Sequence, residues 1–277
     1  KDARKILRRR ARFDHKGTFG RALLVAGSYG KMGAAILAAR AALRSGVGLL
    51  NAHIPRCGYT ALQTAVPEAM VQVDPNETIF TTCGDLSSFD AIGIGPGIGQ
   101  DPRTKNALKE LMKNFAKGVV LDADALNLIA SDDELMQLIP ANSILTPHPR
   151  EFERLAGKWS NDFERLQRLR EFAERVKSVV ILKGAYTSIA IPEGQVFFNS
   201  TGNPGMATGG TGDILTGILG GLYAQGYTAK DTAILGVYLH GLAGDQAIMK
   251  TGMHSMIASD LVEFLPQAFS ELWGNLQ

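Results

Sequence analysis

Residues 203–213 read Asn-Pro-Gly-Met-Ala-Thr-Gly-Gly-Thr-Gly-Asp, and residues 214–219 continue directly as the apolar run Ile-Leu-Thr-Gly-Ile-Leu. Six of the last nine residues of this loop are glycine or threonine, so few bulky side chains keep its backbone away from a ligand. The apolar spacing predicts a helix over 213–225, whose first N–H groups lack partners and whose dipole attracts anions. The stretch therefore predicts an anion site where a glycine-rich loop enters a helix.

Asp213 places a carboxylate on the first turn of that helix, beside the anion site. An aspartate has the wrong charge for holding phosphate, so we expect it to take a proton from a hydroxyl that attacks the phosphorus. The simpler alternative is an ordinary first-turn acid that stabilises its helix, with glycines that merely make a turn. Because further motifs accompany the loop, we favour phosphoryl transfer to a hydroxyl.

The composition is that of an ordinary globular protein, with 277 residues, 45% hydrophobic and 20% charged, and a formal net charge of +2. This length allows one large α/β domain or two small ones, and the charge gives no reason to expect a nucleic acid or a membrane as partner. No apolar run reaches the roughly 18 residues of a membrane span. Cys57 and Cys83 form no C-x-x-C pair, which predicts reduced thiols in a cytoplasmic protein.

Positive charge concentrates in residues 1–12, where Asp2 alone opposes seven basic residues: Lys1, Arg4, Lys5, Arg8, Arg9, Arg10 and Arg12. We predict a solvated helix or an interdomain segment here rather than an RNA contact, followed by a single domain over 13–277. Because the chain begins with lysine rather than methionine, we expect it to be a portion of something longer.

Apolar runs that end in glycine or polar residues alternate with helical patterns along the chain. Strands are predicted over 22–26, 47–54, 68–73, 91–94, 119–121, 143–145 and 179–182, and a hairpin over 187–191 and 195–198. Helices are predicted over 33–46, 104–115, 213–225, 229–249 and 258–272, the last interrupted at Pro266. This order predicts a three-layer α/β fold in which helices flank a mainly parallel central sheet. Most polar motifs follow apolar runs, so they should meet at the carboxyl ends of the strands, where such sheets bind ligands.

Seven motifs together resemble those of the ribokinase-like proteins, and more closely those of the ADP- or ATP-dependent NAD(P)HX dehydratases. The resemblance covers residues 13–277 and rests on segments 16–20 (KGTFG), 27–28 with 33–35 (GS, GAA), 95–97 (GPG), 121–127 (LDADALN), 145–151 (LTPHPRE), 182–187 (LKGAYT) and 203–213. It implies a ribokinase-like fold and a hydro-lyase that repairs damaged nicotinamide cofactors. In that reaction ADP or ATP phosphorylates the ring hydroxyl of the S-epimer of hydrated NADH or NADPH. Departure of phosphate then restores NAD(P)H, and AMP or ADP remains.

The same resemblance implies the surroundings of the reaction. We expect ADP or ATP as the phosphoryl donor, Mg²⁺ with it, and a homo-oligomer in the cytoplasm. Fused members of the family lead us to expect an NAD(P)HX epimerase domain as a fused or separate partner.

Catalytic and nucleotide-binding roles follow residue by residue. Asp213 is assigned as the base, and the N–H groups of Gly210, Thr211 and Gly212 as ligands of the transferring phosphoryl oxygens. The nucleotide is expected along Lys183, Gly184, Ala185, Tyr186 and Thr187, and at Gly212. Lys183 would meet a phosphate and Thr187 would offer a hydroxyl, although a lysine just after a strand is otherwise usually only solvated.

The hydrated dinucleotide is expected to contact Ala34, Gly97 and His148 as well as Asp213, with Ala35 as an alternative to Ala34. His148 stands where small-molecule kinases of this fold often carry the Asn of an Asn-x-x-Glu motif; the other interpretation is a buried histidine bonded to a backbone carbonyl.

Glu151 keeps the place of that motif's glutamate, so it is either an Mg²⁺ ligand or a first-turn helix acid. Asp122 is as readily a structural turn residue as a group that binds substrate ribose, water or metal. We interpret the helix over 229–249, including Tyr238 and His240, as packing.

Two rival functions share most of these features. A ribokinase-like kinase of a vitamin-precursor alcohol would use the same loop and aspartate but release its phosphorylated product. A nucleotide-binding sensor without catalysis would not need Asp213, because phosphate binds more easily without that charge. His148 within Thr-Pro-His-Pro and the whole 203–213 stretch favour the dehydratase.

Overall fold

The computed structural model describes residues 2–274, so Lys1 of the basic segment and residues 275–277 of the predicted domain lie outside it. Nine strands form one sheet in the order β3-β2-β1-β4-β5-β6-β7-β8-β9. Neighbours from β3 to β7 are parallel, whereas β8 runs antiparallel to both β7 and β9. The strands are β1 (Arg21–Val25), β2 (Leu49–Ile54), β3 (Met70–Val73), β4 (Ala91–Ile94), β5 (Val119–Leu121), β6 (Ile144–Leu145), β7 (Val179–Leu182), β8 (Ser188–Ala190) and β9 (Val196–Phe198).

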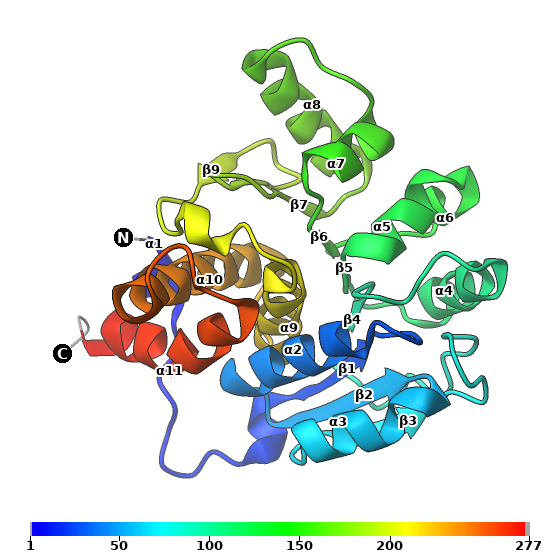
Figure 1. The fold of residues 1–277 in the computed structure, drawn as a ribbon. Helices are drawn as coiled ribbons and strands as arrows, with labels where there is room; N and C mark the ends of the chain where they lie inside the picture. Colours follow the sequence, from blue (N-terminus) through cyan, green and yellow to red (C-terminus); the bar gives the residue numbers. More distant parts are fainter. Residues whose placement is uncertain (1, 275–277) are drawn as a thin grey trace.

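Helices cover both faces of this sheet, as Figure 1 shows. The α-helices are α1 (Asp2–Ile6), α2 (Met32–Arg44), α3 (Tyr59–Ala65), α4 (Pro102–Asn114), α5 (Ala123–Ala130), α6 (Asp133–Gln137), α7 (Pro149–Ala156), α8 (Asp162–Arg175), α9 (Thr211–Ala224), α10 (Ala229–Thr251) and α11 (Ala258–Gly274). Three 3-10 turns lie between them: η1 (Lys16–Phe19), η2 (Arg56–Gly58) and η3 (Pro204–Met206). No helix within residues 2–274 is long and apolar enough to cross a membrane.

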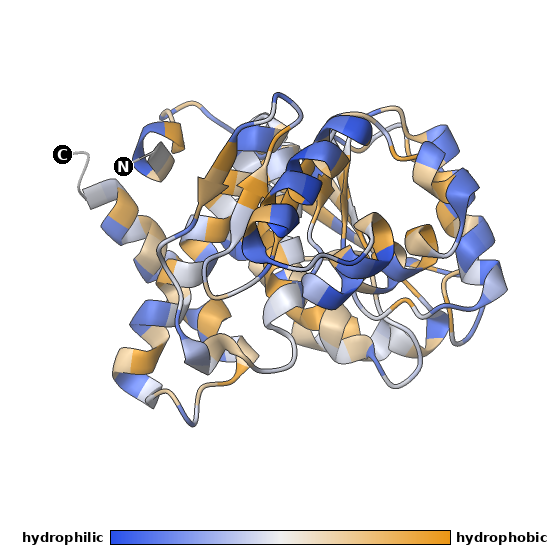
Figure 2. Cartoon of the chain, turned by 90° about the horizontal axis from the view of Figure 1, so that it is seen from above, coloured by the Kyte–Doolittle hydropathy of each residue, from blue (hydrophilic) through white to orange (hydrophobic). Residues whose placement is uncertain are grey.

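Alternate residues of the strands supply two cores, one on each side of the sheet. Leu23 and Val25 of β1 pack with residues of α4, α5 and α8, whereas Ala22 and Leu24 pack with residues of α2 and α3. Figure 2 shows the strands largely in the hydrophobic colour and the outer helices in mixed colours. A strand buried on both faces reads as a continuous apolar run, which is why these strands are visible in the sequence. The predicted three-layer fold with a mainly parallel sheet is confirmed.

The strand register brings several loops to one edge. Val25 pairs with Ile94, Ile94 with Leu121, Leu121 with Leu145, and Leu145 with Val180. The carboxyl ends of β1, β4, β5, β6 and β7 therefore lie side by side, and the polar segments that follow them meet there. The described residues form one continuous sheet of nine strands, which agrees with a single domain. The predicted bounds of that domain, 13–277, stay a prediction.

Helix α11 corrects one prediction, because it continues through Pro266 without interruption. Proline removes one backbone hydrogen bond and costs a helix interior about 3 kcal/mol. Pro266 is exposed, however, and buried residues on both sides of it, Leu265 and Ala268 among them, pack in one apolar cluster with α9 and α10. Burial of that continuous stripe outweighs the missing hydrogen bond.

Two helices that begin at the binding edge pack against each other almost backbone to backbone. A Cβ on Gly217 of α9 would lie 2.1 Å from the carbonyl oxygen of Ala38 in α2, and one on Gly221 would lie 2.7 Å from that of Ala42. Only glycine fits at such distances, so these two positions fix how closely α2 and α9 approach.

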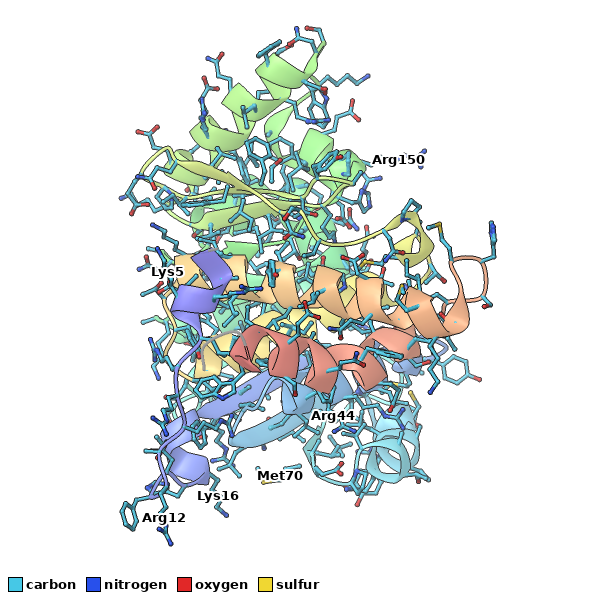
Figure 3. All side chains as sticks on the ribbon, turned by 90° about the vertical axis from the view of Figure 1, so that its left-hand side faces the viewer. Lys5, Arg12, Lys16, Arg44, Met70 and Arg150 are labelled. Carbon is cyan, nitrogen blue, oxygen red and sulfur yellow. The ribbon has the colours of Figure 1, made fainter. Side chains whose placement is uncertain are left out.

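The basic segment, predicted to be either a solvated helix or an interdomain segment, packs against the rest of the protein through several of its residues. Ala3 is buried against α10 and α11, and Figure 3 shows Lys5 beside α10 and Arg12 at the far end of the segment. Arg8 stacks 4.3 Å from the Tyr227 ring centroid and donates to two carbonyls that follow α9. Arg10 stacks on Phe19 and donates to the carbonyl of Gly46, just past α2. Cations at helix carboxyl ends are favourable, so the charge holds the segment in place.

Candidate active site

The glycine-rich loop enters α9 through a residue that must be glycine. Gly210 is the N-cap of the helix with φ of 95°, and a Cβ there would lie 2.6 Å from Cδ1 of Leu37. The Thr211 hydroxyl donates to the carbonyls of Met206 and Thr208, so it closes the loop rather than facing a ligand. No residue within 2–274 accepts a hydrogen bond from the N–H groups of Gly210, Thr211 or Gly212. These N–H groups lie at the positive end of the helix, where the sequence predicts an anion site, and that role stays a prediction.

Asp213 follows them and forms no hydrogen bond or ion pair with any described residue. Burial raises its pKa to about 6, the carboxylates of Asp122 and Asp124 contribute to the rise, and Lys183 opposes it. A carboxylate with a pKa near neutrality is a better proton acceptor than an ordinary aspartate and is still ionised at pH 7. The geometry and the charge both suit a general base beside an anion site.

Lys183 lies closer to α9 than the sequence suggests. Its ammonium is 2.8 Å from Oδ1 of Asp122, and the other carboxylate oxygen accepts a 2.7 Å bond from Thr216 of α9. Burial alone would raise the pKa of Asp122, but Lys183 and Thr216 outweigh it and keep that pKa below its usual value. Lys183 is thus not merely solvated, and Asp122 contributes a buried charge to the site.

The predicted nucleotide segment is an exposed turn between β7 and β8. Gly184, Ala185 and Tyr186 are exposed, and the Tyr186 side chain is 77% accessible. The Thr187 hydroxyl donates to the carbonyl of Gly184 and accepts from its N–H, so it shapes the turn rather than standing free. The turn starts beside Lys183, whose ammonium adjoins the first turn of α9, so it borders the predicted anion site. Its role in binding a nucleotide stays a prediction.

Two of the predicted substrate residues, Gly97 in the loop after β4 and Ala34 in the first turn of α2, face each other. Gly97 has φ of 66°, and a Cβ there would lie 3.3 Å from that of Ala34 and 3.1 Å from that of Lys31. Ser28 donates a 2.7 Å hydrogen bond to the carbonyl of Gly97, which joins the two loops. Ala35 is fully buried while Ala34 is partly exposed, so Ala34 is the one that a ligand can reach.

Asp124, on the first turn of α5, holds together the segments that follow β1 and β4. Its carboxylate accepts from the Gly99 N–H at 2.9 Å and from the Gln100 side chain, and Lys31 lies 3.5 Å away. The sequence contains a signal for it, the second aspartate of Asp-Ala-Asp, but nothing local shows which loops it joins.

His148 and Glu151 form a reciprocal cap at the start of α7. Nδ1 of His148 accepts from the N–H groups of Arg150 and Glu151, and Oε2 of Glu151 accepts from the His148 N–H. Burial lowers the pKa of His148, and the nearby Lys183 and Arg154 lower it further. Because Nδ1 accepts, the neutral ring carries its proton on Nε2, 3.4 Å from Oε1 of Glu151. The imidazole is therefore aimed, and only its Nε2 edge is available to a ligand.

Glu151 lies in the first turn of α7 and caps it, as expected of a first-turn helix acid. Its other predicted role, as an Mg²⁺ ligand, stays a prediction. It is 5% exposed, and burial raises its pKa. No group of three or more His, Cys, Asp or Glu that could hold a metal occurs within residues 2–274. Mg²⁺ commonly takes one or two carboxylates together with substrate phosphates and water, so a single glutamate beside a nucleotide fits that chemistry.

His240 on α10 is a contact that sequence reasoning missed. Its Nε2 lies 2.9 Å from the carbonyl oxygen of Thr211, at the start of α9. Burial lowers the pKa of His240 to about 4, although the bond to Thr211 opposes this. An apolar helix in the sequence cannot show that one of its histidines supports a loop 29 residues away.

A cavity of about 800 Å³ lies elsewhere, beside the basic segment at the other end of α9. Arg8, Arg44, Phe19 and Trp273 are among its lining residues. None of the site residues predicted from the sequence lines it. Chemistry rather than volume therefore favours a site at the carboxyl ends of the strands.

Comparison with known proteins gives the relatives of the chain. The sequence profile of a family described as NAD(P)H-hydrate dehydratase matches residues 22–267. A bifunctional NAD(P)H-hydrate repair enzyme of Moorella thermoacetica is 42% identical over 279 residues, which cover 97% of this chain and 53% of that protein. An ADP-dependent (S)-NAD(P)H-hydrate dehydratase of Neisseria meningitidis is 37% identical over 248 residues, which cover 87% of this chain and 81% of that protein. The chain thus spans about half the length of the bifunctional relatives that it matches.

Solved structures agree with the sequence relatives. An ADP/ATP-dependent NAD(P)H-hydrate dehydratase of Bacillus subtilis, co-crystallised with ATP and Mg²⁺, matches with a TM-score of 0.85 at 33% identity. That match covers 98% of this chain and 96% of the other. A ribokinase of Arabidopsis thaliana matches with a TM-score of 0.56 at 12% identity, over 88% of this chain and 98% of the other, which shows the fold alone. The predicted ribokinase-like fold is confirmed.

Proposed function

This chain belongs to the NAD(P)H-hydrate dehydratase family, and on that basis we propose that it restores NADH or NADPH from the S-epimer of the hydrate with ADP or ATP. The observation that carries the proposal is Asp213, an unbonded carboxylate with a pKa of about 6 beside three free N–H groups. A base and an anion site in contact suit a hydroxyl that attacks a phosphorus.

The first step forms an ester between the ring hydroxyl and phosphate. The hydroxyl oxygen attacks the terminal phosphorus of the nucleotide, its proton passes to Asp213, and the P–O bond to AMP or ADP breaks. The N–H groups of Gly210, Thr211 and Gly212 bind the phosphoryl oxygens as charge develops, and such donors are worth about 2.7–4 kcal/mol each in favourable cases. Positioning and charge are most of what phosphoryl transfer needs.

The second step is elimination. Hydroxide is a poor leaving group near neutral pH, whereas phosphate is a good one. The ring nitrogen pushes electrons toward the departing phosphate, the C–O bond breaks, and loss of a proton from the neighbouring carbon returns the ring double bond. Both steps require one cleft to keep the dinucleotide in place until phosphate has left.

The cleft divides between its two ligands. The nucleotide lies along Lys183, Gly184, Ala185, Tyr186 and Thr187, and reaches Gly212. Glu151 would hold Mg²⁺ together with the nucleotide phosphates, where the ion would neutralise phosphate charge. Ala34 and Gly97 face the hydrated dinucleotide on the other side of the cleft. The Nε2 edge of His148, 3.4 Å from Glu151, contacts the dinucleotide where the two ligands adjoin.

The vitamin-precursor kinase remains the alternative activity, since the fold and the aspartate suit both. The aimed imidazole of His148 in place of an asparagine supports the dehydratase. A sensor without catalysis is the less favourable alternative, because Asp213 would only repel its ligand.

The wider setting of the reaction is also a proposal. The bifunctional relatives are about twice as long as this chain, which supports a fused or separate epimerase as partner. We further propose that the protein is a homo-oligomer and acts in the cytoplasm.

One assay tests the proposal directly. The protein is incubated with hydrated NADH and ADP or ATP while the near-ultraviolet absorbance of the reduced nicotinamide is followed. We expect the absorbance to return only when a nucleotide is present. Phosphate accumulating on a thiamin or pyridoxine precursor, with the hydrate unrepaired, would favour the kinase instead.

A further inference from the structure

Asp122 does not cap the helix that it begins. It occupies the N-cap position of α5, where an aspartate side chain ordinarily accepts a bond from a first-turn N–H, yet it makes no such bond. The next residue, Ala123, has φ of 47°, a left-handed conformation that is unfavourable for a residue with a Cβ. The carboxylate of Asp122 thus turns away from its own helix, at the cost of a missing cap hydrogen bond and an unfavourable backbone conformation at Ala123.

The carboxylate instead joins two elements of the active site. Lys183 binds one of its oxygens and Thr216 the other, and Asp122 is 1% exposed. The Lys183 side chain is 23% exposed, and among the described residues only Asp122 accepts a bond from its three-donor ammonium. Asp122 is thus inaccessible to a ligand, while Lys183 keeps free donors that a ligand can reach.

This ion pair adjoins the first turn of α9. A Cβ on Gly212 would lie 3.6 Å from Nζ of Lys183 and 3.8 Å from Oδ2 of Asp122, one residue before Asp213. The charges that act on Asp213 are those of Asp122, Asp124 and Lys183. Lys183 in turn faces His148, Glu151 and His240, from α7 and α10.

We propose that Asp122 is a positioning residue of this site, which holds the Lys183 ammonium against the first turn of α9 and away from Asp213. There the free donors of Lys183 meet the transferring phosphoryl group, and the base stays unpaired. The inference rests on the proposed function for its kinetic readout. Without the carboxylate of Asp122, the ammonium is free to pair with Asp213, which would mask the base.

The decisive variant is Asp122→Asn, which keeps the size of the side chain and an acceptor for Thr216. We expect the pKa of Asp213 to fall by about one unit, because a repelling carboxylate is lost and Lys183 is free to approach. The pKa is read by carbon NMR titration of carboxyl-labelled aspartate, with Asp213→Asn identifying the signal. Turnover on hydrated NADH should fall at least about tenfold with its acid limb at lower pH, since a masked base accepts protons poorly. Calorimetry should show ADP affinity unchanged or slightly higher, because the site has lost a negative charge.

Two further variants separate positioning from general damage. Thr216→Val removes one hydrogen bond to Asp122 but leaves its ion pair, so the pKa of Asp213 should stay in place. In a Lys183→Met background, Asp122→Asn should cause no further loss of turnover, because no ammonium remains to be positioned. An Asp213 pKa that does not respond to Asp122→Asn, or additive losses of turnover, would overturn the proposal. The NMR titration needs no substrate, so the two proposals can fail separately. If the wild-type protein is inactive on hydrated NADH, the proposed function is wrong. The positioning role of Asp122 still holds in that case if Asp122→Asn lowers the pKa of Asp213.

Discussion

His240 of α10 donates a 2.9 Å hydrogen bond from Nε2 to the main-chain oxygen of Thr211, the first residue of α9. A carbonyl only accepts, so the ring carries a proton on Nε2. Burial lowers the pKa of His240 to about 4, which keeps the ring neutral at pH 7. The bond supports the turn whose N–H groups form the predicted anion site. Asp245 of the same helix holds the start of the loop by accepting from the Gly202 N–H and the Asn203 side chain.

This bond makes the stability of the protein sensitive to acid. The pKa of His240 is about 4 in the folded state against an ordinary value of 6.5, so its contribution is present above pH 6.5 and is lost as the pH falls toward 4. A His240→Gln variant keeps a donor but cannot titrate. Urea unfolding should therefore show wild type losing on the order of 1–3 kcal/mol relative to this variant between pH 7 and pH 4. Curves that stay parallel would contradict a buried neutral imidazole.

Replacement of the base should separate binding from turnover. Asp213→Asn keeps the size of the side chain but cannot accept the hydroxyl proton, so turnover on hydrated NADH should fall by at least about 10²-fold. Binding of ADP, measured by calorimetry, should persist. Near-normal turnover would remove Asp213 from the mechanism, and circular dichroism must first show that the variant is folded.

The same residue should govern how rate and stability depend on pH, in opposite directions. Turnover requires ionised Asp213, so its rate should fall about tenfold per pH unit below the pKa of about 6. Because the folded pKa is raised above the ordinary 3.8, the folded state loses stability as the pH rises through that window. Asp213→Asn should thus be more stable than wild type at pH 7 by on the order of 1–3 kcal/mol, and the difference should vanish near pH 4. A variant that is equally stable at both pH values would show that the carboxylate is not perturbed.

Gly97→Val should weaken the dinucleotide more than the nucleotide. The new side chain would meet Lys31 and Ala34 on the predicted substrate side. Two strands, β5 and β6, separate the loop of Gly97 after β4 from the β7–β8 turn. Gly99→Val is the matched control, since Gly99 also has positive φ but has open space where a Cβ would lie. Calorimetry should show loss of hydrated NADH affinity for the first variant at several times that of the second. Equal losses for ADP and hydrated NADH in Gly97→Val would refute the division of the cleft.

His148 can be tested without losing its helix cap. His148→Ala removes both the Nε2 edge and the cap, which costs about 1 kcal/mol, whereas His148→Asn restores a capping oxygen. We expect both variants to slow recovery of NADH while ADP affinity stays nearly unchanged, and only the alanine variant to lose stability. If His148→Asn repairs the hydrate at the wild-type rate, the histidine serves α7 alone.

The sequence predicts the elements whose signals are local. Every predicted strand appears: central strands such as β4 and β7 are continuous apolar runs, whereas β8 and β9 show the alternation of a hairpin. The glycine-rich loop enters α9 where its composition places it. Helices α3, α5, α6 and α7 escape notice because they are short, with seven, eight, five and eight residues. Helix α8 escapes notice although its 14 residues match the length of α9. The capping residue Asn161 with Glu164 is the signal that would have located α8.

Contacts between distant segments are what the sequence does not contain. Lys183 follows a strand in a way that suggests a solvated residue or a phosphate ligand, and only the sheet order brings it to Asp122, 61 residues away. The bonds from Thr216 to Asp122 and from His240 to Thr211 depend in the same way on how α9 and α10 pack. The glycines at 217 and 221 resemble helix-weakening residues until α2 is placed beside them.

That backbone contact between α2 and α9 limits which parts of the protein can move during a catalytic cycle. Ala34 lies on α2 and Asp213 on α9, and no side chain separates the two helices at Gly217 or Gly221. The substrate wall and the base therefore travel as one rigid body, and the alignment of hydroxyl with carboxylate does not wait for closure. If the protein acts as we propose, we expect opening and closing in the exposed turn after β7, and this turn would then control the departure of AMP or ADP.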